Sequence, residues 1–179
     1  MLRPILLSAL LAASFSAVAA DPTEFDLPQT RSAWSFQLSG TAQHFNQPRG
    51  RRHHEWNQQN WGVGLQYDDR TTGSPWSRTY AAGTLKDSYG VNGAYVTAAQ
   101  YYDVFAAGGV TAQAGVGLFA LWRAMDWSGK REWLVVPLPV AHFEHVKSGI
   151  GVNIVLSPSV DSARHEIPGF LFFQATARF

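Results

Sequence analysis

The stretch VTAQAGVGLFALW, residues 110–122, decides the fold because its side chains alternate in character along its whole length. Successive side chains of a β-strand point to opposite faces. One face of this stretch is apolar throughout, with Val110, Ala112, Ala114, Val116, Leu118, Ala120 and Trp122. The other face begins polar and small and ends apolar, with Thr111, Gln113, Gly115, Gly117, Phe119 and Leu121. The stretch therefore predicts a strand whose two faces meet different surroundings.

Seven further segments read as strands, separated by turn residues such as Gly73 and Pro75. Short turns and longer loops follow one another between them. This arrangement predicts an all-β fold, an eight-stranded antiparallel up-and-down transmembrane β-barrel. The seven segments are 34–43, 61–68, 77–88, 93–103, 132–145, 150–157 and 169–179.

The first of these strands shows why the barrel is expected to lie in a membrane. Trp34, Phe36, Leu38, Gly40 and Ala42 share one face, and polar residues occupy the other. In an outer-membrane barrel the apolar face meets lipid and the polar face lines the lumen. A soluble β-sandwich would bury the same apolar face in its core, so alternation alone leaves both readings open.

The N-terminus and the composition favour the membrane barrel. Residues 1–20 carry Arg3, an apolar run over 5–15 and small residues at 18–20, a pattern typical of a signal peptide. We expect a periplasmic lead-in over 21–33 and an outer-membrane barrel over 34–179, in a Gram-negative cell. Charged residues make up 15% of the 179, against about 25% in typical soluble proteins, and there are seven tryptophans. Such a surface suits contact with lipid.

Several kinds of partner are not expected. A net charge of +1 gives no reason to predict nucleic-acid binding, and a chain without cysteine has no thiolate ligands. His142 and His145 are three residues apart, which places them on opposite faces of a strand. We therefore predict no metal and no cofactor, and we expect a monomer.

The lumen-facing residues suggest an apolar cavity. In segment 132–145 they change from leucine and valine to His142 and Glu144, and in segment 169–179 from Phe170 and Phe172 to Arg178. The barrel interior would then be polar at its periplasmic end and apolar toward the outside, where a hydrocarbon chain could be held. The alternative is that side chains simply fill the interior, as in other eight-stranded barrels.

The segment YAAGTLKDSY, residues 80–89, reads as one strand that ends with Asp87 and Ser88 at the rim of the barrel. Asp and Ser beside a turn usually bind their own backbone. Their place at the mouth of a lipid-facing barrel also makes them candidates for chemistry on a lipid.

Several segments together resemble one family. Five segments are similar, in the same order along the chain, to the outer-membrane lipid A palmitoyltransferases, the PagP family. They are NWGVG at 60–64, TLKDSY at 84–89, GVTAQAGVGL at 109–118, VPLPV at 136–140 and the closing strand ending in Phe179. The resemblance runs from about residue 34 to residue 179. It implies an eight-stranded barrel with an interior hydrocarbon ruler. It also implies transfer of a palmitoyl chain from a phospholipid donor to lipid A as the acceptor.

The resemblance implies His44, Asp87 and Ser88 as the catalytic residues, with His53 and His54 as rivals for the histidine. Histidine can serve as a general base. Ser88 can act as a nucleophile or as a hydrogen-bond donor to the oxyanion. A small residue at the floor of the ruler corresponds to Ala98 or Ala99.

Two other functions fit the same barrel. One is a lipid A or phospholipid esterase, in which water replaces the acceptor. The other is a structural outer-membrane barrel without catalysis. The sequence leaves open the acyl chain length, the acceptor position on lipid A and the route by which lipid reaches the site.

Overall fold

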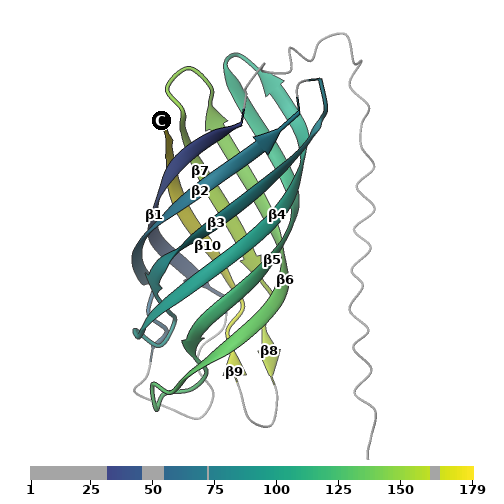
Figure 1. The fold of residues 1–179 in the computed structure, drawn as a ribbon. Helices are drawn as coiled ribbons and strands as arrows, with labels where there is room; N and C mark the ends of the chain where they lie inside the picture. The colour runs from purple at the N-terminus through teal and green to yellow at the C-terminus, as the bar shows by residue number, and fades with distance from the viewer. Residues whose placement is uncertain (1–31, 46–54, 72, 162–165) are drawn as a thin grey trace, which may run out of the picture.

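The structure, a computed structural model, describes residues 32–45, 55–71, 73–161 and 166–179 (Figure 1). The predicted signal peptide and nearly all of the predicted lead-in lie outside these residues. A search of the described residues for a membrane-spanning helix finds none.

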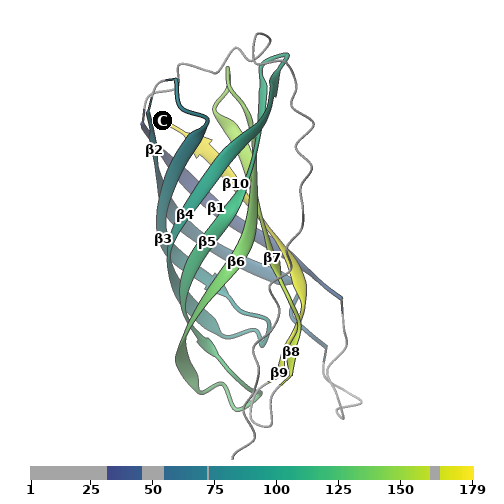
Figure 2. The same ribbon diagram turned by 90° about the vertical axis from the view of Figure 1, so that its right-hand side faces the viewer.

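Eight long strands close into one barrel, and every neighbouring pair is antiparallel (Figures 1 and 2). Sequential strands pair with each other, and the first strand closes the barrel by pairing with the last, from Ser35 with Arg178 to His44 with Phe170. The predicted fold class is thereby confirmed. The strands are β1 (Ala33–His44), β2 (Gln59–Arg70), β3 (Trp76–Lys86), β4 (Asn92–Ala107), β5 (Val110–Ala124), β6 (Arg131–His145), β7 (Ile150–Ser157) and β10 (Phe170–Arg178).

Some predicted strand ends were wrong. Asp87 and Ser88 do not belong to a strand but follow β3, in a turn that Asp87 itself stabilises. β4 continues beyond residue 103 because a register shift between Asp103 and Phe105 lets its end keep pairing with β5. The predicted loop at 160–168 contains a short hairpin, β8 (Val160–Asp161) and β9 (Glu166–Ile167).

The outer surface of the barrel is apolar. Trp34, Phe36 and Leu38 of β1 are all at least half exposed, and outward Trp61 and Trp133 lie near the other end of the barrel. In water such a surface would be unfavourable, whereas in a bilayer the closed barrel pairs its own backbone groups and meets lipid with this belt. The location predicted from the sequence, the outer membrane, agrees with this surface.

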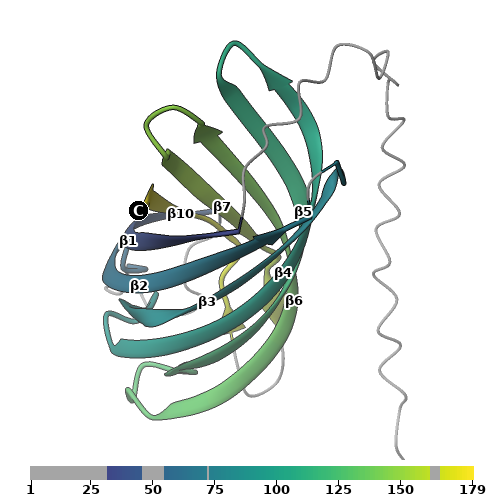
Figure 3. The same cartoon turned by 45° about the horizontal axis from the view of Figure 1, so that its top comes forward.

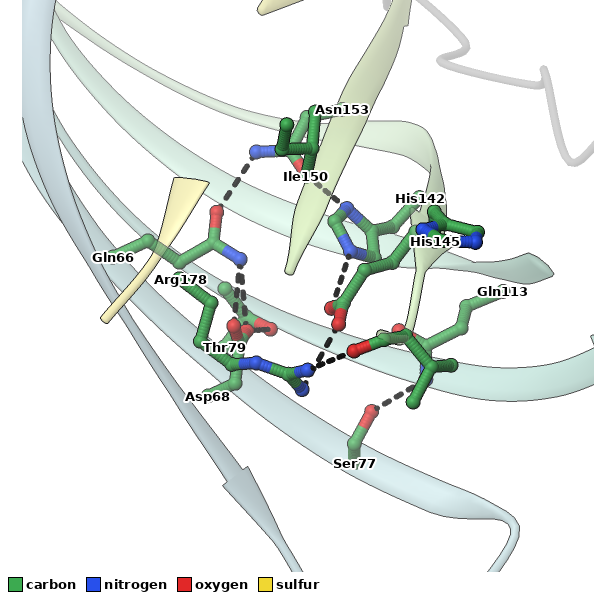
Figure 4. A network of polar contacts seen from close by, with 12 residues as sticks. Gln66, Asp68, Ser77, Thr79, Gln113, His142, His145, Ile150, Asn153 and Arg178 are labelled. Atoms are coloured by element: carbon green, nitrogen blue, oxygen red, sulfur yellow. Dashed lines mark hydrogen bonds and ion pairs between the residues drawn. The ribbon is translucent and has the colours of Figure 1, made fainter. Parts of the chain in front are cut away.

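The end of the barrel that carries the C-terminus is filled with polar side chains. This end, which is turned forward in Figure 3, also holds the β2–β3, β4–β5 and β6–β7 turns. A network of hydrogen bonds spans the lumen there (Figure 4). Asn153 donates to Gln66 at 2.8 Å, Gln66 donates to both oxygens of Asp68, and His142 Nδ1 lies 2.7 Å from Asn153 Oδ1. One end of the lumen is therefore polar, as the sequence predicted; its periplasmic orientation stays a prediction.

Removing Asp103 should destabilise this polar end. The buried Asp103 carboxylate accepts two hydrogen bonds from Arg70, at 3.1 and 3.2 Å, and one from Gln113 at 2.6 Å. Asp103→Ala leaves Arg70 without its counter-charge, a change that costs about 3–5 kcal/mol for a buried pair. Urea unfolding in lipid vesicles measures the loss. Glu132→Ala, which breaks the exposed pair with Lys130, is the control and should leave stability unchanged; equal effects would contradict the prediction.

Candidate functional site

A β-bulge in β1 turns His44 into the barrel. Ser39 pairs with Gln174 and Thr41 with Phe173, so Gly40 is an extra, unpaired residue. Beyond this bulge the two faces exchange. Ala42 is buried inside the barrel, while Thr41 and Gln43 are exposed. The prediction that Ala42 shares the lipid face with Trp34 was therefore wrong, and the exchange gives His44 its inward direction.

His44 and Ser88 form a hydrogen-bonded pair. The Nε2 atom of His44 lies 3.0 Å from Oγ of Ser88, although the two residues are 44 positions apart in sequence. Ser88 is buried, and aromatic side chains hold the His44 ring. Trp56 stacks on it at 5.8 Å between ring centroids, and Phe170 packs edge-on at 5.7 Å. The structure thus brings together two of the three residues that the resemblance implied.

His44 is the last residue of β1 and is half-buried, with Nε2 directed at Ser88. When the proton of the neutral ring is on Nδ1, Nε2 accepts the Ser88 hydroxyl proton in a hydrogen bond. This is the arrangement that a general base requires.

Asp87 does not orient the histidine. Its Oδ1 accepts the backbone N–H groups of Tyr89 and Val91, both at 2.9 Å, and its Oδ2 accepts the N–H of Ala124 at 2.7 Å. His44 Nδ1 is buried and has no hydrogen-bond partner among the described residues. Asp87 instead fixes the turn that carries Ser88 and ties that turn to β5. The pair is therefore His44–Ser88, without a carboxylate as a third member.

Two asparagines that the sequence analysis did not single out hold the same turn from the other side. Asn57 donates through Nδ2 to the Asp87 carbonyl at 2.9 Å, and its backbone N–H donates to the Ser88 carbonyl at 2.8 Å. Asn60 donates to the Lys86 carbonyl at 2.7 Å. Asn57 precedes β2 and Asn60 is the second residue of β2, and neither carries a sequence signal for this role, because it depends on contacts with a turn 26 to 30 residues further along the chain.

Arg123 was also missed. Arg123 was predicted to lie in a polar loop at 123–131, but β5 extends to Ala124, and Arg123 points inward with 7% of its surface exposed. Its pairing with Glu132 on β6 continues the ladder past the predicted end. A charged residue directly after an apolar strand is usually solvated, and for this reason the burial of Arg123 has no signal in the local sequence.

An apolar pocket leads from this site into the barrel. Asp87, Ser88 and Arg123 line it at the end of the barrel where β3 ends and β6 begins, and its wall is built largely from apolar residues of β4, β5, β6, β7 and β10. Tyr95 and Gln174 join this lining, and the Tyr95 hydroxyl hydrogen-bonds with both Gln37 and Gln174. The apolar wall includes Ala99, Phe119, Leu121, Leu138, Val140, Val155 and Phe172.

Of the two candidates for the small residue at the floor of the ruler, Ala98 and Ala99, only Ala99 faces the pocket. Ala99 is buried and lines the pocket, whereas its neighbour Ala98 is exposed on the outer face of β4. Ala99 pairs with Thr79 on β3 and with Gly117 on β5. The Phe119 ring covers Gly117, where an added Cβ would lie 2.7 Å from the ring and 3.3 Å from the Ala99 Cβ, so Ala99 and Phe119 together form this part of the wall.

The other histidines lie away from this pocket. His142 is buried in the polar end and His145 is exposed, on opposite faces of β6 as predicted. His53 and His54, the rivals of His44, lie outside the described residues. Within the described ranges, no group of three His, Asp or Glu side chains is arranged to hold a metal ion.

No model of a known family matches the chain, and no curated protein matches it. Two similar solved structures are both of the Yersinia pestis outer membrane protein Ail. Ail in a phospholipid bilayer nanodisc is 10% identical, with 83% of this chain and 100% of that chain covered and a TM-score of 0.41. Crystalline Ail in complex with the heparin analogue sucrose octasulfate is 13% identical, with 83% and 97% covered and a TM-score of 0.38. At these values the likeness is confined to the barrel form.

Proposed function

We propose that the chain is an outer-membrane acyltransferase that moves a palmitoyl or similar chain from a phospholipid to lipid A. The observation that carries the proposal is the 3.0 Å pair of His44 Nε2 and Ser88 Oγ, with Ser88 lining an apolar pocket. A hydroxyl paired with a neutral imidazole is the usual arrangement of an activated nucleophile. The resemblance of TLKDSY and the other segments to the PagP family supports the same reaction.

The proposed reaction has two steps. In the first, Ser88 Oγ attacks the ester carbonyl carbon of the donor while His44 Nε2 takes the hydroxyl proton. The bond from the carbonyl carbon to the glycerol oxygen breaks, and His44 returns the proton to that oxygen, which releases a lysophospholipid. In the second, a lipid A hydroxyl attacks the acyl-serine and passes its proton through His44 to Ser88. The acyl chain stays in the pocket through both steps. Each methylene buried there stabilises the bound chain by about 0.8 kcal/mol.

The two alternative functions, an esterase and a structural barrel, make different use of the His44–Ser88 pair and the pocket. An esterase would use the same His44–Ser88 pair but pass the acyl chain to water. A structural barrel would need neither the pair nor the apolar pocket. A half-buried imidazole paired with a buried serine hydroxyl has no obvious use in a barrel that does no chemistry, and this favours an enzyme.

Mass spectrometry of lipid A tests the proposal. Gram-negative cells that lack any lipid A palmitoyltransferase would express the chain, and cells with empty vector serve as the control. We expect a lipid A species heavier by one acyl unit. Release of free fatty acid with no heavier lipid A would indicate the esterase. If the barrel is folded in the outer membrane and neither product forms, the structural reading holds.

The wall at Ala99 should set the acyl chain length. Ala99→Leu adds three carbons to the pocket and displaces about three methylenes of a bound chain. At about 0.8 kcal/mol each, the preference for a 16-carbon over a 13-carbon donor should fall about 50-fold. Competition between donors of different chain length measures this preference. Ala98→Leu, one residue away on the lipid face, should change nothing, and equal changes in both variants would rule out the pocket as the acyl site.

A further inference from the structure

Arg123, which is 7% exposed, lines the pocket with a guanidinium whose donors are largely unused. Among the described residues it makes one hydrogen bond, from Nε to the Ala124 carbonyl at 3.3 Å, and no ion pair. Its carbon Cζ lies 6.0 Å from the centre of the Tyr89 ring. An arginine carries five N–H donors and is always charged in proteins. The four donors on its two terminal nitrogens are therefore free of protein acceptors in this part of the chain.

Asp87 does not satisfy this charge by direct contact. Its carboxylate attracts Arg123 electrostatically, but its oxygens already accept three backbone N–H groups. A buried cation without a hydrogen-bonded anion is costly. A guanidinium with unused donors that also lines a pocket indicates that an anionic ligand accepts hydrogen bonds from it there.

The position of Arg123 indicates which group that ligand carries. Arg123 and Ser88 line the same end of the pocket, while its wall toward the middle of the barrel is largely apolar. A lipid whose acyl chain occupies the apolar part places its polar headgroup at this end, beside Arg123. The planar fork of a guanidinium matches two oxygens of a phosphate.

We infer that Arg123 binds a phosphate group of the lipid substrate and so places the ester carbonyl over Ser88. This inference deepens the proposed function and rests on it for the identity of the lipid. Phosphate occurs both in the phospholipid donor and in lipid A, and the chemistry at Arg123 is the same for both. Arg123 acts here as a binding residue for the headgroup, separate from the pair that performs acyl transfer.

Binding without turnover tests the inference. The protein, refolded in dodecyl maltoside, is titrated with 1-palmitoyl lysophosphatidylcholine and with 1-palmitoylglycerol, which share a chain and differ in the phosphocholine. Tryptophan fluorescence reports binding, because Trp56 and Trp127 contact Tyr89 beside Arg123. A second arm compares lipid A with its dephosphorylated form. We expect at least tenfold tighter binding of the phosphate-bearing lipid in at least one arm, and that arm identifies the source of the phosphate.

Three variants decide the role of the side chain. Arg123→Gln should abolish the phosphate preference and leave the affinity for the phosphate-free lipid unchanged. Arg131→Gln, which removes an exposed guanidinium stacked on Trp122, is the control and should keep the preference. If Arg123→Gln does not refold, Arg123→Lys takes its place, with an expected loss of at least threefold because an ammonium lacks the fork.

The outcomes separate this inference from the proposed function. A wild-type protein without phosphate preference in either arm overturns the inference, as does a preference that survives Arg123→Gln. Acyl transfer to lipid A is measured independently. A phosphate preference in a protein that transfers no acyl chain would retain the Arg123 site and reject the transferase.

Discussion

Ser88→Ala and His44→Ala should each reduce acyl transfer by at least about 10³-fold. The two side chains lie 3.0 Å apart and are expected to act as one unit, nucleophile and base. Removing either member of such a unit costs nearly as much as removing both. The double variant should therefore be no slower than either single variant, within about threefold. Rates are measured with purified protein in detergent, with phospholipid donor and lipid A acceptor.

The control for these variants is Ser148→Ala. Ser148 also contacts a histidine ring, with Oγ 2.9 Å from Nδ1 of His145, but in the exposed β6–β7 turn. The Ser148→Ala variant should transfer acyl chains at the wild-type rate. Wild-type rates in Ser88→Ala would leave no catalytic role for the pair. Loss in Ser88→Ala with full activity in His44→Ala would move the base to His53 or His54.

The alternation of side chains predicted most of the barrel. The inward sets of β6 and β10 were assigned correctly, because a period of two fixes both faces once one face must meet lipid. His142 and Glu144 were correctly placed at the polar end for the same reason. Regular pairing is a local property, and a single sequence reports it well.

The geometry of the site depends on departures from that regularity. The bulge at Gly40 exchanges the faces of β1, and no residue pattern in 34–43 announces it. Arg123 lies one position beyond the apparent end of a strand, where burial is decided by the partner strand β6. Asp87 was chosen for its place beside Ser88, but its use of three backbone N–H groups depends on β5, 37 residues away at Ala124. Contacts of this range cannot be read from local sequence.

Asp87→Asn should lower activity by loosening the Ser88 turn, with no direct loss of a catalytic charge. The asparagine side chain retains one carbonyl oxygen, which can accept Tyr89 and Val91 N–H, but it presents an amide N–H₂ to the N–H of Ala124. A buried donor left unsatisfied costs about 1–3 kcal/mol. We expect amide hydrogen exchange at Ala124, Val91 and Tyr89 to accelerate, together with a fall in acyl transfer of about 10–10²-fold.

A catalytic-triad role for Asp87 would give a different pair of results. Substituting the aspartate of a true triad leaves the geometry intact and reduces the rate about 10⁴-fold. Protected amides combined with a loss of that size would therefore contradict the structural role. Asp126→Asn is the matched control, since Asp126 also accepts a backbone N–H, from Ser128 at 2.8 Å, but in an exposed turn. Its amides and its activity should be unchanged. Faster exchange confined to the Ser88 turn would then show that Asp87 supports catalysis by holding Ser88 within reach of His44.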